Sequence, residues 1–265
     1  MNKICAVIPM YGLNELTDKC VNLVLENAGM EIDIVVVDDG SPIPYQENPT
    51  NSCRVKVLRL EQNSGYTNAT NQGILWCGDR YKYIHLLNND IIPHKDFIKL
   101  LYEFMEEDYV TGIASSVRLN KMDGKFITEL WGVDLIRGYQ AILNGWENDL
   151  PPATCDWLPI CSSLVRLDMI REIGLLDKRF RNHCSDSDYC IRANMNKWNV
   201  TVVPSSKVEH THQTTTKTLN VIPDIDQKLF IEKLAGVQYQ QLMNKMPLDC
   251  SSNTWGKIEF STYKK

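Results

Sequence analysis

Continuous apolar runs that alternate with helical patterns constrain the fold of this chain more than any other feature. In the first half of the sequence, helical patterns lie at residues 13–28, 67–79 and 94–108, and strand-like runs lie at 3–9, 31–39, 54–60 and 82–90. The runs are rich in Val, Ile and Leu without in/out alternation, which is typical of strands covered on both faces. The sequence therefore predicts an α/β fold with a Rossmann-like, mainly parallel central sheet flanked by helices.

The second half of the chain shows the same pattern after a looser stretch at about 117–155. Expected there are short strands around 126–133, a strand at 156–166, helices at 167–174 and 185–197, a strand at 199–204 and a last helix at about 223–246. We therefore expect one domain over residues 1–212, made of a first half (1–116) and a second half (117–212), and a C-terminal helical tail at 213–265.

Composition narrows the class of protein. The chain has 265 residues, 43% of them hydrophobic and 23% charged, which suits one large α/β domain. Its net charge of −5 provides no basic field for a nucleic-acid backbone or an anionic membrane surface, which argues against both partners. No apolar run approaches the roughly 18 residues of a membrane span, and a strand-like run begins at once without a signal peptide. The expectation is a cytoplasmic protein.

The cysteines point to reduced thiols. There are nine, an odd number, at irregular spacing and without a CxxC pair, which fits neither a disulfide framework nor a zinc site. Cys5 and Cys161 lie within apolar runs, so we expect them to be small buried hydrophobic residues.

Polar residues follow the predicted strands where each strand ends. These strand ends are residues 9–12 (PMYG), 38–41 (DDGS), 63–65 (NSG) and 88–90 (NND). Ligands of such sheets bind beyond the carboxyl ends of the strands, so the hypothesis is a nucleotide-binding cleft. The sequence has no GxGxxG and no GxxxxGK[ST] loop, so another group must neutralise a bound diphosphate.

The run YIHLLNNDII at residues 83–92 has two readings. Asn, Asp and Pro form turns, so an ordinary loop is the simpler one. In the other, Asp90 is an acidic metal ligand. A histidine from the later segment His-Thr-His at residues 210–212, either His210 or His212, then completes a divalent-cation site. Histidines in polar loops are usually solvated, so the second reading requires that the fold bring the segments together.

The segment CSDSDYC at 184–190 also has two readings. Ser185 is a suitable N-cap, and Asp186 and Asp188 fall in the first turn, where the helix dipole favours anions. Two carboxylates exceed what capping requires. The dipole would also keep a carboxylate ionised, which suits a general base.

The order of these motifs resembles glycosyltransferase family 2, inverting nucleotide-sugar transferases with the GT-A fold, and in detail its rhamnosyltransferase-like branch. The matching segments, over roughly residues 3 to 212, are AVIPMY, VVVDDGS, NSGYTNATNQGI, HLLNND, SSLVRLDMIREIGLLDKRF, SDSDYCIR and VVPSSKVEH. The sequence departs from the family pattern at Met10-Tyr11-Gly12, at Ser185 and at Ile160.

The resemblance implies roles for particular residues. Asp186 would be the catalytic base, Asp90 the metal ligand and His210 a second ligand, ahead of His212. The nucleotide-sugar donor would be contacted by Pro9, Tyr11, Asp38, Asp39, Asn63, Gly65, Asn71, Asn88 and Asn89. The implied cofactor is a divalent cation, Mn²⁺ or Mg²⁺, with Mn²⁺ favoured by an imidazole ligand.

The implied activity is the transfer of a sugar from a nucleotide-diphosphate sugar to the hydroxyl of a glycan or another acceptor. Three alternatives remain. One is a sugar-1-phosphate nucleotidyltransferase, although its Gly-rich, Lys-containing loop after the first strand is missing. Another is a non-catalytic sugar- or nucleotide-binding module. In the third, the acceptor is a nucleic acid with a hydroxylated base, which the acidic net charge argues against. The C-terminal helix would pack on the core or join two copies as a homo-oligomer.

Overall fold

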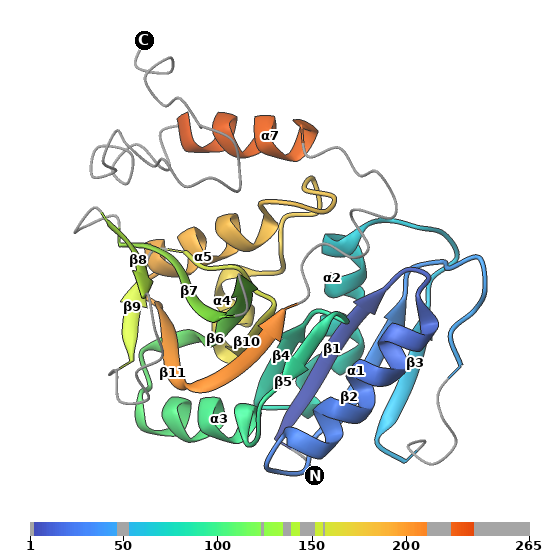
Figure 1. Cartoon of the computed structure of the whole chain (residues 1–265). Helices are drawn as coiled ribbons and strands as arrows, with labels where there is room; N and C mark the ends of the chain where they lie inside the picture. The colour runs from blue at the N-terminus through green and yellow to red at the C-terminus, as the bar shows by residue number, and fades with distance from the viewer. Residues whose placement is uncertain are drawn as a thin grey trace.

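A computed structural model of the chain describes residues 3–46, 53–122, 125–134, 139–143, 152–155, 157–210 and 224–235. Within these residues eleven strands form one sheet, in the order β3-β2-β1-β4-β10-β6-β11-β5. β7 pairs with β6 and β8, and β9 pairs with β11 (Figure 1).

The strands are β1 (Ile4–Met10), β2 (Asp33–Asp38), β3 (Val55–Arg59), β4 (Tyr83–Leu87), β5 (Ile91–Pro93), β6 (Thr111–Met122), β7 (Lys125–Asp134), β8 (Tyr139–Leu143), β9 (Ala153–Cys155), β10 (Ser162–Arg166) and β11 (Asn199–His210). The helices are α1 (Asn14–Asn27), α2 (Tyr66–Cys77), the 3-10 turn η2 (Gly78–Arg80), α3 (Phe97–Glu107), α4 (Leu167–Ile173), α5 (Ser185–Met195) and α7 (Asp224–Ala235).

The predicted α/β fold with a central sheet is confirmed, but its parallel part is smaller than expected. β3, β2, β1 and β4 are parallel neighbours, whereas β10 runs antiparallel to both β4 and β6. All five residues of β10 are buried, because helices cover both faces of the sheet here. Burial on both faces therefore marks β10 as a covered strand without fixing its direction.

β6 was not expected from the sequence, since its centre reads as small and polar. Ser115 and Ser116 of β6 are buried at the middle of the sheet. The Ser115 hydroxyl lies 2.8 Å from that of Ser163, and the Ser116 hydroxyl lies 2.9 Å from that of Ser162 and 2.7 Å from that of Ser206. These hydroxyls satisfy one another, so a strand without a long apolar run is buried at low cost.

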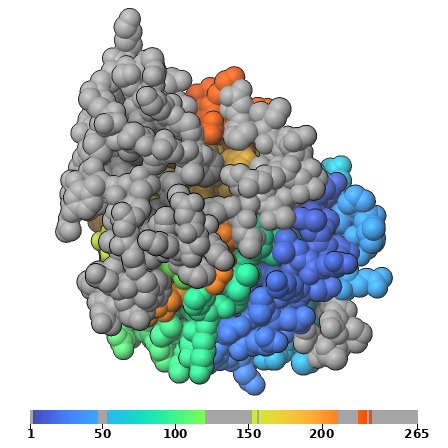
Figure 2. Space-filling view, in the orientation of Figure 1, coloured from blue at the N-terminus to red at the C-terminus, as the bar shows by residue number. Residues whose placement is uncertain are grey.

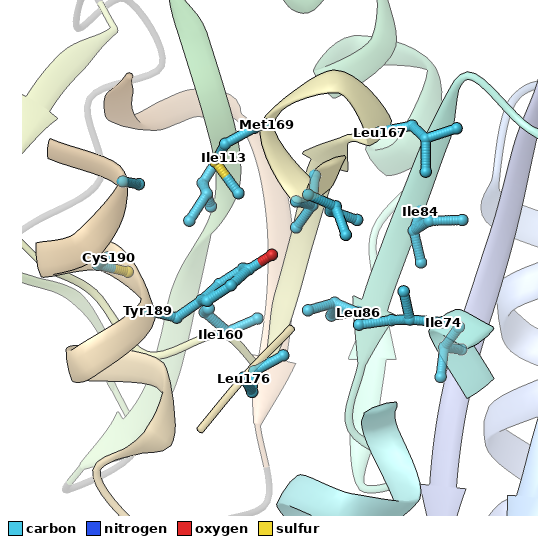
Figure 3. Packing of buried hydrophobic residues seen from close by; sticks show 14 of the residues in the cluster. Ile74, Ile84, Leu86, Ile113, Ile160, Leu167, Met169, Leu176, Tyr189 and Cys190 are labelled. Carbon is cyan, nitrogen blue, oxygen red and sulfur yellow. The ribbon is translucent and has the colours of Figure 1, made fainter. Parts of the chain in front are cut away.

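Two apolar layers cover the sheet. On one face α1 and α3 pack on Ile4, Ala6 and Ile8 of β1, and these helices form neighbouring surface in the space-filling view (Figure 2). On the other face α2, α4 and α5 contribute to a second cluster, which includes Cys5 and Val7 of β1. Figure 3 shows part of this second layer, with Tyr189 of α5 pointing toward the sheet.

Gly73 explains why α2 lies so close to the sheet. A Cβ at this position would lie 2.3 Å from a methyl carbon of Val7 and 3.0 Å from one of Val37. The close approach holds the N-terminus of α2 at the carboxyl ends of β1 and β2, where the candidate site lies.

The C-terminal helix is confirmed only in part. α7 covers Asp224–Ala235 of the expected 223–246, and residues from 236 onward lie outside the described ranges. The inward face of α7 packs next to α5, where Phe230 joins a cluster with Phe180, Cys184 and Ile191 (Figure 1). The domain boundaries at 212 and 213 and a homo-oligomer through this helix stay predictions.

Two further predictions concern membranes and thiols. In the part of the chain that the structure describes, no helix combines the length and apolarity needed to cross a bilayer. The eight cysteines of the described ranges are free thiols, and Cys5 and Cys161 are buried as expected.

Candidate active site

The two aspartates at the end of β2 have separate partners. The carboxylate of Asp38, fully buried, accepts hydrogen bonds from the backbone N–H of Ser41 at 2.8 Å and of Tyr45 at 3.0 Å. Arg59 donates a further bond to it. Burial opposes ionisation, but these hydrogen bonds outweigh it and hold the pKa of Asp38 below its usual value. Asp38 thus fixes the turn that follows β2.

The Asp39 carboxylate holds the segment expected to lie beneath the donor. It accepts hydrogen bonds from the N–H and hydroxyl of Ser64, at 2.8 and 2.7 Å, and from the N–H of Gly65 at 2.8 Å. Two carboxylate oxygens offer about four acceptor sites, so roughly one is left for a ligand. Asp39 and residues 63–65 therefore form one unit at the ends of β2 and β3.

The remaining predicted donor contacts lie around this unit. Pro9 is buried beside Val37, and Tyr11 is half-buried at the end of β1. The side-chain oxygen of Asn63 accepts a 2.6 Å hydrogen bond from Arg181. Asn71 is buried and exchanges two hydrogen bonds with the backbone of Leu176, at 2.8 and 3.1 Å, so its amide fixes a neighbouring loop.

The segment after β4 sends its side chains in two directions. The Asn89 amide donates a 3.0 Å hydrogen bond to the Thr17 hydroxyl of α1. Asn88 and Asp90 instead lie against His210. The NND segment is therefore a turn after β4 whose side chains contact a distant strand.

The residues that follow explain how His210 reaches this place. The run resumes as β5, which pairs antiparallel with the end of β11 so that Ile91 lies opposite His210. Asp90 precedes Ile91, so the register places carboxylate and imidazole together. The distance from Asp90 Oδ1 to His210 Nε2 is 3.1 Å, and both side chains are 8% exposed. His212 lies outside the described residues.

The donor atoms of this cluster fit a hard or borderline divalent cation. Asn88 Nδ2 also lies 3.1 Å from His210 Nε2, so an amide N–H and a carboxylate face the same ring nitrogen. That nitrogen cannot accept from Asn88 and donate to Asp90 at once. The buried Asn88 Oδ1 has no hydrogen-bond partner among the described residues. An ion taking both oxygens and the imidazole would satisfy all three groups.

Further ligands would have to come from outside this cluster. Within the ranges that the structure describes, no three His, Cys, Asp or Glu side chains are grouped as a metal site. A cation held here would take its remaining ligands from other groups, such as water or a bound substrate.

The two acids at the start of α5 differ in environment. Asp188 is fully buried and paired with Arg192 at 2.9 Å and with Lys233 of α7, so its role is structural. The carboxylate of Asp186 is half-buried and accepts a 2.8 Å hydrogen bond from the N–H of Ser187. Burial raises the pKa of Asp186, although the Ser187 N–H partly opposes this.

The predicted cap of this helix is wrong. α5 begins at Ser185, so the capping position belongs to Cys184, which has a left-handed conformation with φ 61° and makes no side-chain capping bond. The backbone N–H groups of the preceding loop are satisfied by Asp226 of α7 instead.

Asp90 and Asp186 act on the same side chains. Burial raises the pKa of the Tyr66 hydroxyl, and the charges of Asp186 and Asp90 raise it further. Burial and the same two charges raise the pKa of Cys161 to about 11, against the opposing effect of Arg118. Both carboxylates therefore act electrostatically on Tyr66 and Cys161.

Short backbone contacts tie these residues together. The Tyr66 hydroxyl donates to the Ile160 carbonyl at 3.2 Å, and the N–H of Asn88 donates to the Cys161 carbonyl at 3.0 Å. Residues 160–161 thus lie between α2 and the end of β4. The sequence analysis did not identify Tyr66 or Arg118 as site residues. The one indication in the sequence was that Tyr66 directly follows the NSG segment, and nothing indicated Arg118.

Comparisons with known proteins agree with this arrangement. The sequence profile of glycosyl transferase family 2 matches residues 5–161, more than half of the chain. Glycosyltransferase GlyG of Streptococcus pneumoniae serotype 4 is 26% identical over 188 residues, 66% of this chain and 60% of that protein. An uncharacterized glycosyltransferase of Rickettsia felis is 29% identical over 128 residues, 47% of this chain and 21% of that protein. The chain thus spans less than two thirds of the length of these relatives.

Solved structures resemble the chain in fold. GalNAc-T7, crystallised with UDP, GalNAc and Mn²⁺, matches with a TM-score of 0.62 at 14% identity, over 78% of this chain and 43% of that chain. TarS of S. aureus matches with a TM-score of 0.58 at 16% identity, over 92% of this chain and 42% of that chain. These likenesses confirm the predicted GT-A fold. The profile match over more than half of the chain shows that the chain belongs to glycosyl transferase family 2.

Proposed function

We propose that the protein is an inverting glycosyltransferase that moves a sugar from a nucleoside-diphosphate sugar to an acceptor hydroxyl. One observation supports this most: Tyr66 and residues 160–161 join the segment of Asp90 to the loop that precedes Asp186. The N–H of Asn88 donates to the Cys161 carbonyl at 3.0 Å, the Tyr66 hydroxyl donates to the Ile160 carbonyl at 3.2 Å, and the Tyr66 N–H donates to the Asn182 side chain at 3.1 Å. The site that binds the leaving group and the catalytic base must lie close together, because the acceptor and the departing diphosphate lie on either side of one sugar carbon.

The carboxyl ends of β1 and β2 would hold the nucleotide. Asp39 keeps acceptor capacity for an N–H of the base, and Pro9 and Tyr11 line the neighbouring strand end. Residues 63–65 would form the floor beneath the donor, in the conformation that their bonds to Asp39 impose.

Asp90, His210 and the Asn88 side-chain oxygen would hold a divalent cation at the end of β4. When bound, the cation supplies positive charge that offsets the negative charge of the nucleoside diphosphate. The mixed nitrogen and oxygen ligands favour Mn²⁺ over the harder Mg²⁺. The likeness to a GT-A structure that contains UDP and Mn²⁺ supports this assignment.

Asp186 would accept the proton of the acceptor. The acceptor oxygen bonds to the anomeric carbon while its proton passes to the Asp186 carboxylate. The bond from that carbon to the diphosphate oxygen breaks, and the nucleoside diphosphate leaves with the electron pair. Because attack and departure are in line, the anomeric configuration inverts. Burial strengthens Asp186 as a base by raising its pKa.

The donor and the cation can be tested together. Thermal shift and nucleoside-diphosphate release are measured with UDP-, GDP- and dTDP-sugars, with and without Mn²⁺. We expect one donor class to stabilise the protein only with Mn²⁺. Asp90→Ala and His210→Ala should abolish the Mn²⁺-dependent shift. His94→Ala is the control, since His94 lies on the same sheet edge with its side chain 41% exposed. A shift that is unchanged in Asp90→Ala would refute the cation site.

The base is tested by Asp186→Asn. Loss of a general base costs about 10²–10⁴-fold in rate, so turnover should fall by that factor while donor binding is kept. Asp168→Asn is the control, because Asp168 is also a first-turn acid but is 70% exposed. Undiminished transfer by Asp186→Asn would refute the assignment of the base.

A further inference from the structure

The inward face of α7 carries three side chains that contact the segment around Asp186. Asp226, Phe230 and Lys233 recur at helical spacing and so lie on one face of α7. Asp226 is 5% exposed and Phe230 8% exposed, and the Lys233 side chain is 13% exposed. This face is buried against the chain rather than presented to solvent.

Asp226 binds the loop that leads into α5. Its Oδ1 accepts the N–H of Arg181 at 2.8 Å, and its Oδ2 accepts the N–H groups of Asn182 at 2.7 Å and His183 at 2.8 Å. Three successive N–H groups that converge on one anion form a nest. The loop therefore depends on a carboxylate from a distant element for its backbone conformation, since buried N–H groups need partners.

The opposite side of the same loop is hydrogen-bonded to the start of α2, which directly follows residues 63–65. The Arg181 carbonyl accepts the N–H of Thr67 at 3.1 Å, and the Asn182 side-chain oxygen accepts the N–H of Tyr66 at 3.1 Å. These bonds do not involve Asp226. The loop is thus held from two sides, by the start of α2 and by α7.

Asp186 follows this loop directly. Only Cys184, with φ 61°, and Ser185 separate it from His183, so the direction of the loop sets where the carboxylate lies. α5 has no side-chain cap of its own. Lys233 adds a second attachment by binding Asp177 at 2.8 Å and by contacting Asp188 within α5. α7 therefore holds the loop before Asp186 and the helix after it.

We propose that α7 positions the catalytic base, with Asp226 as a positioning residue that acts on Asp186 through the loop 181–183. The inference rests on the proposed role of Asp186 and adds to it. Transfer should then require residues beyond the stretch that matches the family profile, which ends at residue 161.

The test is Asp226→Asn, which keeps the size of the side chain but replaces one acceptor oxygen by an N–H donor. Full-length variants are assayed at a temperature well below the melting temperature of each, with Mn²⁺ and the most active of the UDP-, GDP- and dTDP-sugars. Misplacement of a reacting group by about 1 Å costs on the order of 10²-fold, so kcat should fall by about 10–100-fold. The donor KM should change by less than about threefold, because the bonds to α2 remain.

Glu232→Gln is the matched control, because it removes a carboxylate from the exposed side of the same helix. It should leave kcat unchanged. A purely structural role for Asp226 predicts a lower melting temperature with normal kcat in the folded enzyme, and that result would overturn the inference.

A double variant separates this inference from the proposed function. If Asp226 acts through Asp186, adding Asp226→Asn to Asp186→Asn should lower the residual rate by less than about twofold. If Asp186→Asn is inactive while Asp226→Asn has full kcat, the positioning role fails and the base assignment stands. If Asp186→Asn is fully active, the proposed base fails, and the positioning role fails with it.

Discussion

At the scale of single residues, the site separates acids that look alike in the sequence. Asp38 and Asp188 are fully buried and form ion pairs with arginines, whereas no ion pair of Asp186 is found among the described residues and burial raises its pKa. A carboxylate matched with a cation is held ionised and is a weak base. One that is poorly solvated binds a proton more readily. The two acids of the α5 start thus have different roles, although they are two residues apart.

Asp186→Asn should make the protein more stable at neutral pH. The raised pKa means that the folded state binds a proton more tightly than the unfolded state, so the ionised carboxylate costs stability above the folded pKa. Asn resembles the protonated acid and removes this cost. We expect the melting temperature to rise by about 2–4 °C at pH 7.5.

The gain should disappear as the pH falls below the ordinary pKa of the group, 3.8, where Asp186 is protonated in both states. Calorimetry at several pH values measures it, with the exposed Asp168→Asn as the control. A melting temperature that falls at neutral pH would contradict a destabilising charge at this position.

At the scale of elements, glycines allow the close approaches that build the site. Gly65 has φ 93°, lies at the N-cap position of α2 and donates its N–H to Asp39. A Cβ there would lie 2.5 Å from a side-chain carbon of Arg181 and 2.6 Å from its carbonyl oxygen. Residues 63–65, which are proposed to lie beneath the donor, therefore contact the loop before α5 at a position where only glycine fits.

Gly65→Ala should weaken both the fold and donor binding. An unfavourable φ costs about 1–3 kcal/mol, and the contact with Arg181 adds to it. Gly174→Ala is the matched control, because Gly174 has φ 80° with nothing within 4 Å of its Cβ position. Urea unfolding should show a greater loss for Gly65→Ala, with weaker donor binding by titration calorimetry in that variant alone. Equal losses would mean that the close approach is not important.

At the scale of the whole molecule, charges from distant parts of the sequence hold α7 on the domain. Lys233 contacts Asp177 and Asp188, and these three side chains are nearly or fully buried. Removing one partner of a buried pair leaves a buried charge without full compensation, which is costly. Surface pairs contribute far less, since water screens them.

Lys233→Met should lower the free energy of unfolding by about 3–5 kcal/mol. Lys99→Met should change it by less than about 1 kcal/mol, because the pair of Lys99 with Glu103 is exposed and 3.8 Å long. Urea unfolding measures both values. A double-mutant cycle with Asp188→Asn should show strong coupling for Lys233, and the absence of coupling would contradict the proposed attachment of α7.

Much of the architecture could be predicted from local patterns. The predicted bounds of the elements in the first half agree with the structure to within a few residues. This holds for the strands β1, β2, β3 and β4 and for the helices α1, α2 and α3. β6 was missed because its buried serines bond to serines of strands far along the chain. The direction of β10 was missed because a strand covered on both faces is buried throughout whether it runs parallel or antiparallel.

The sequence alone determined the elements of the first half and the chemistry available at their ends, because periodicity and residue type are local properties. The tertiary structure decided which of these groups meet. The pairing of β5 with β11 places His210 beside Asp90, and α7 supplies Asp226 to the loop before Asp186. Such contacts join residues that are distant along the chain. They depend on strand register and helix packing, which no short stretch of sequence specifies.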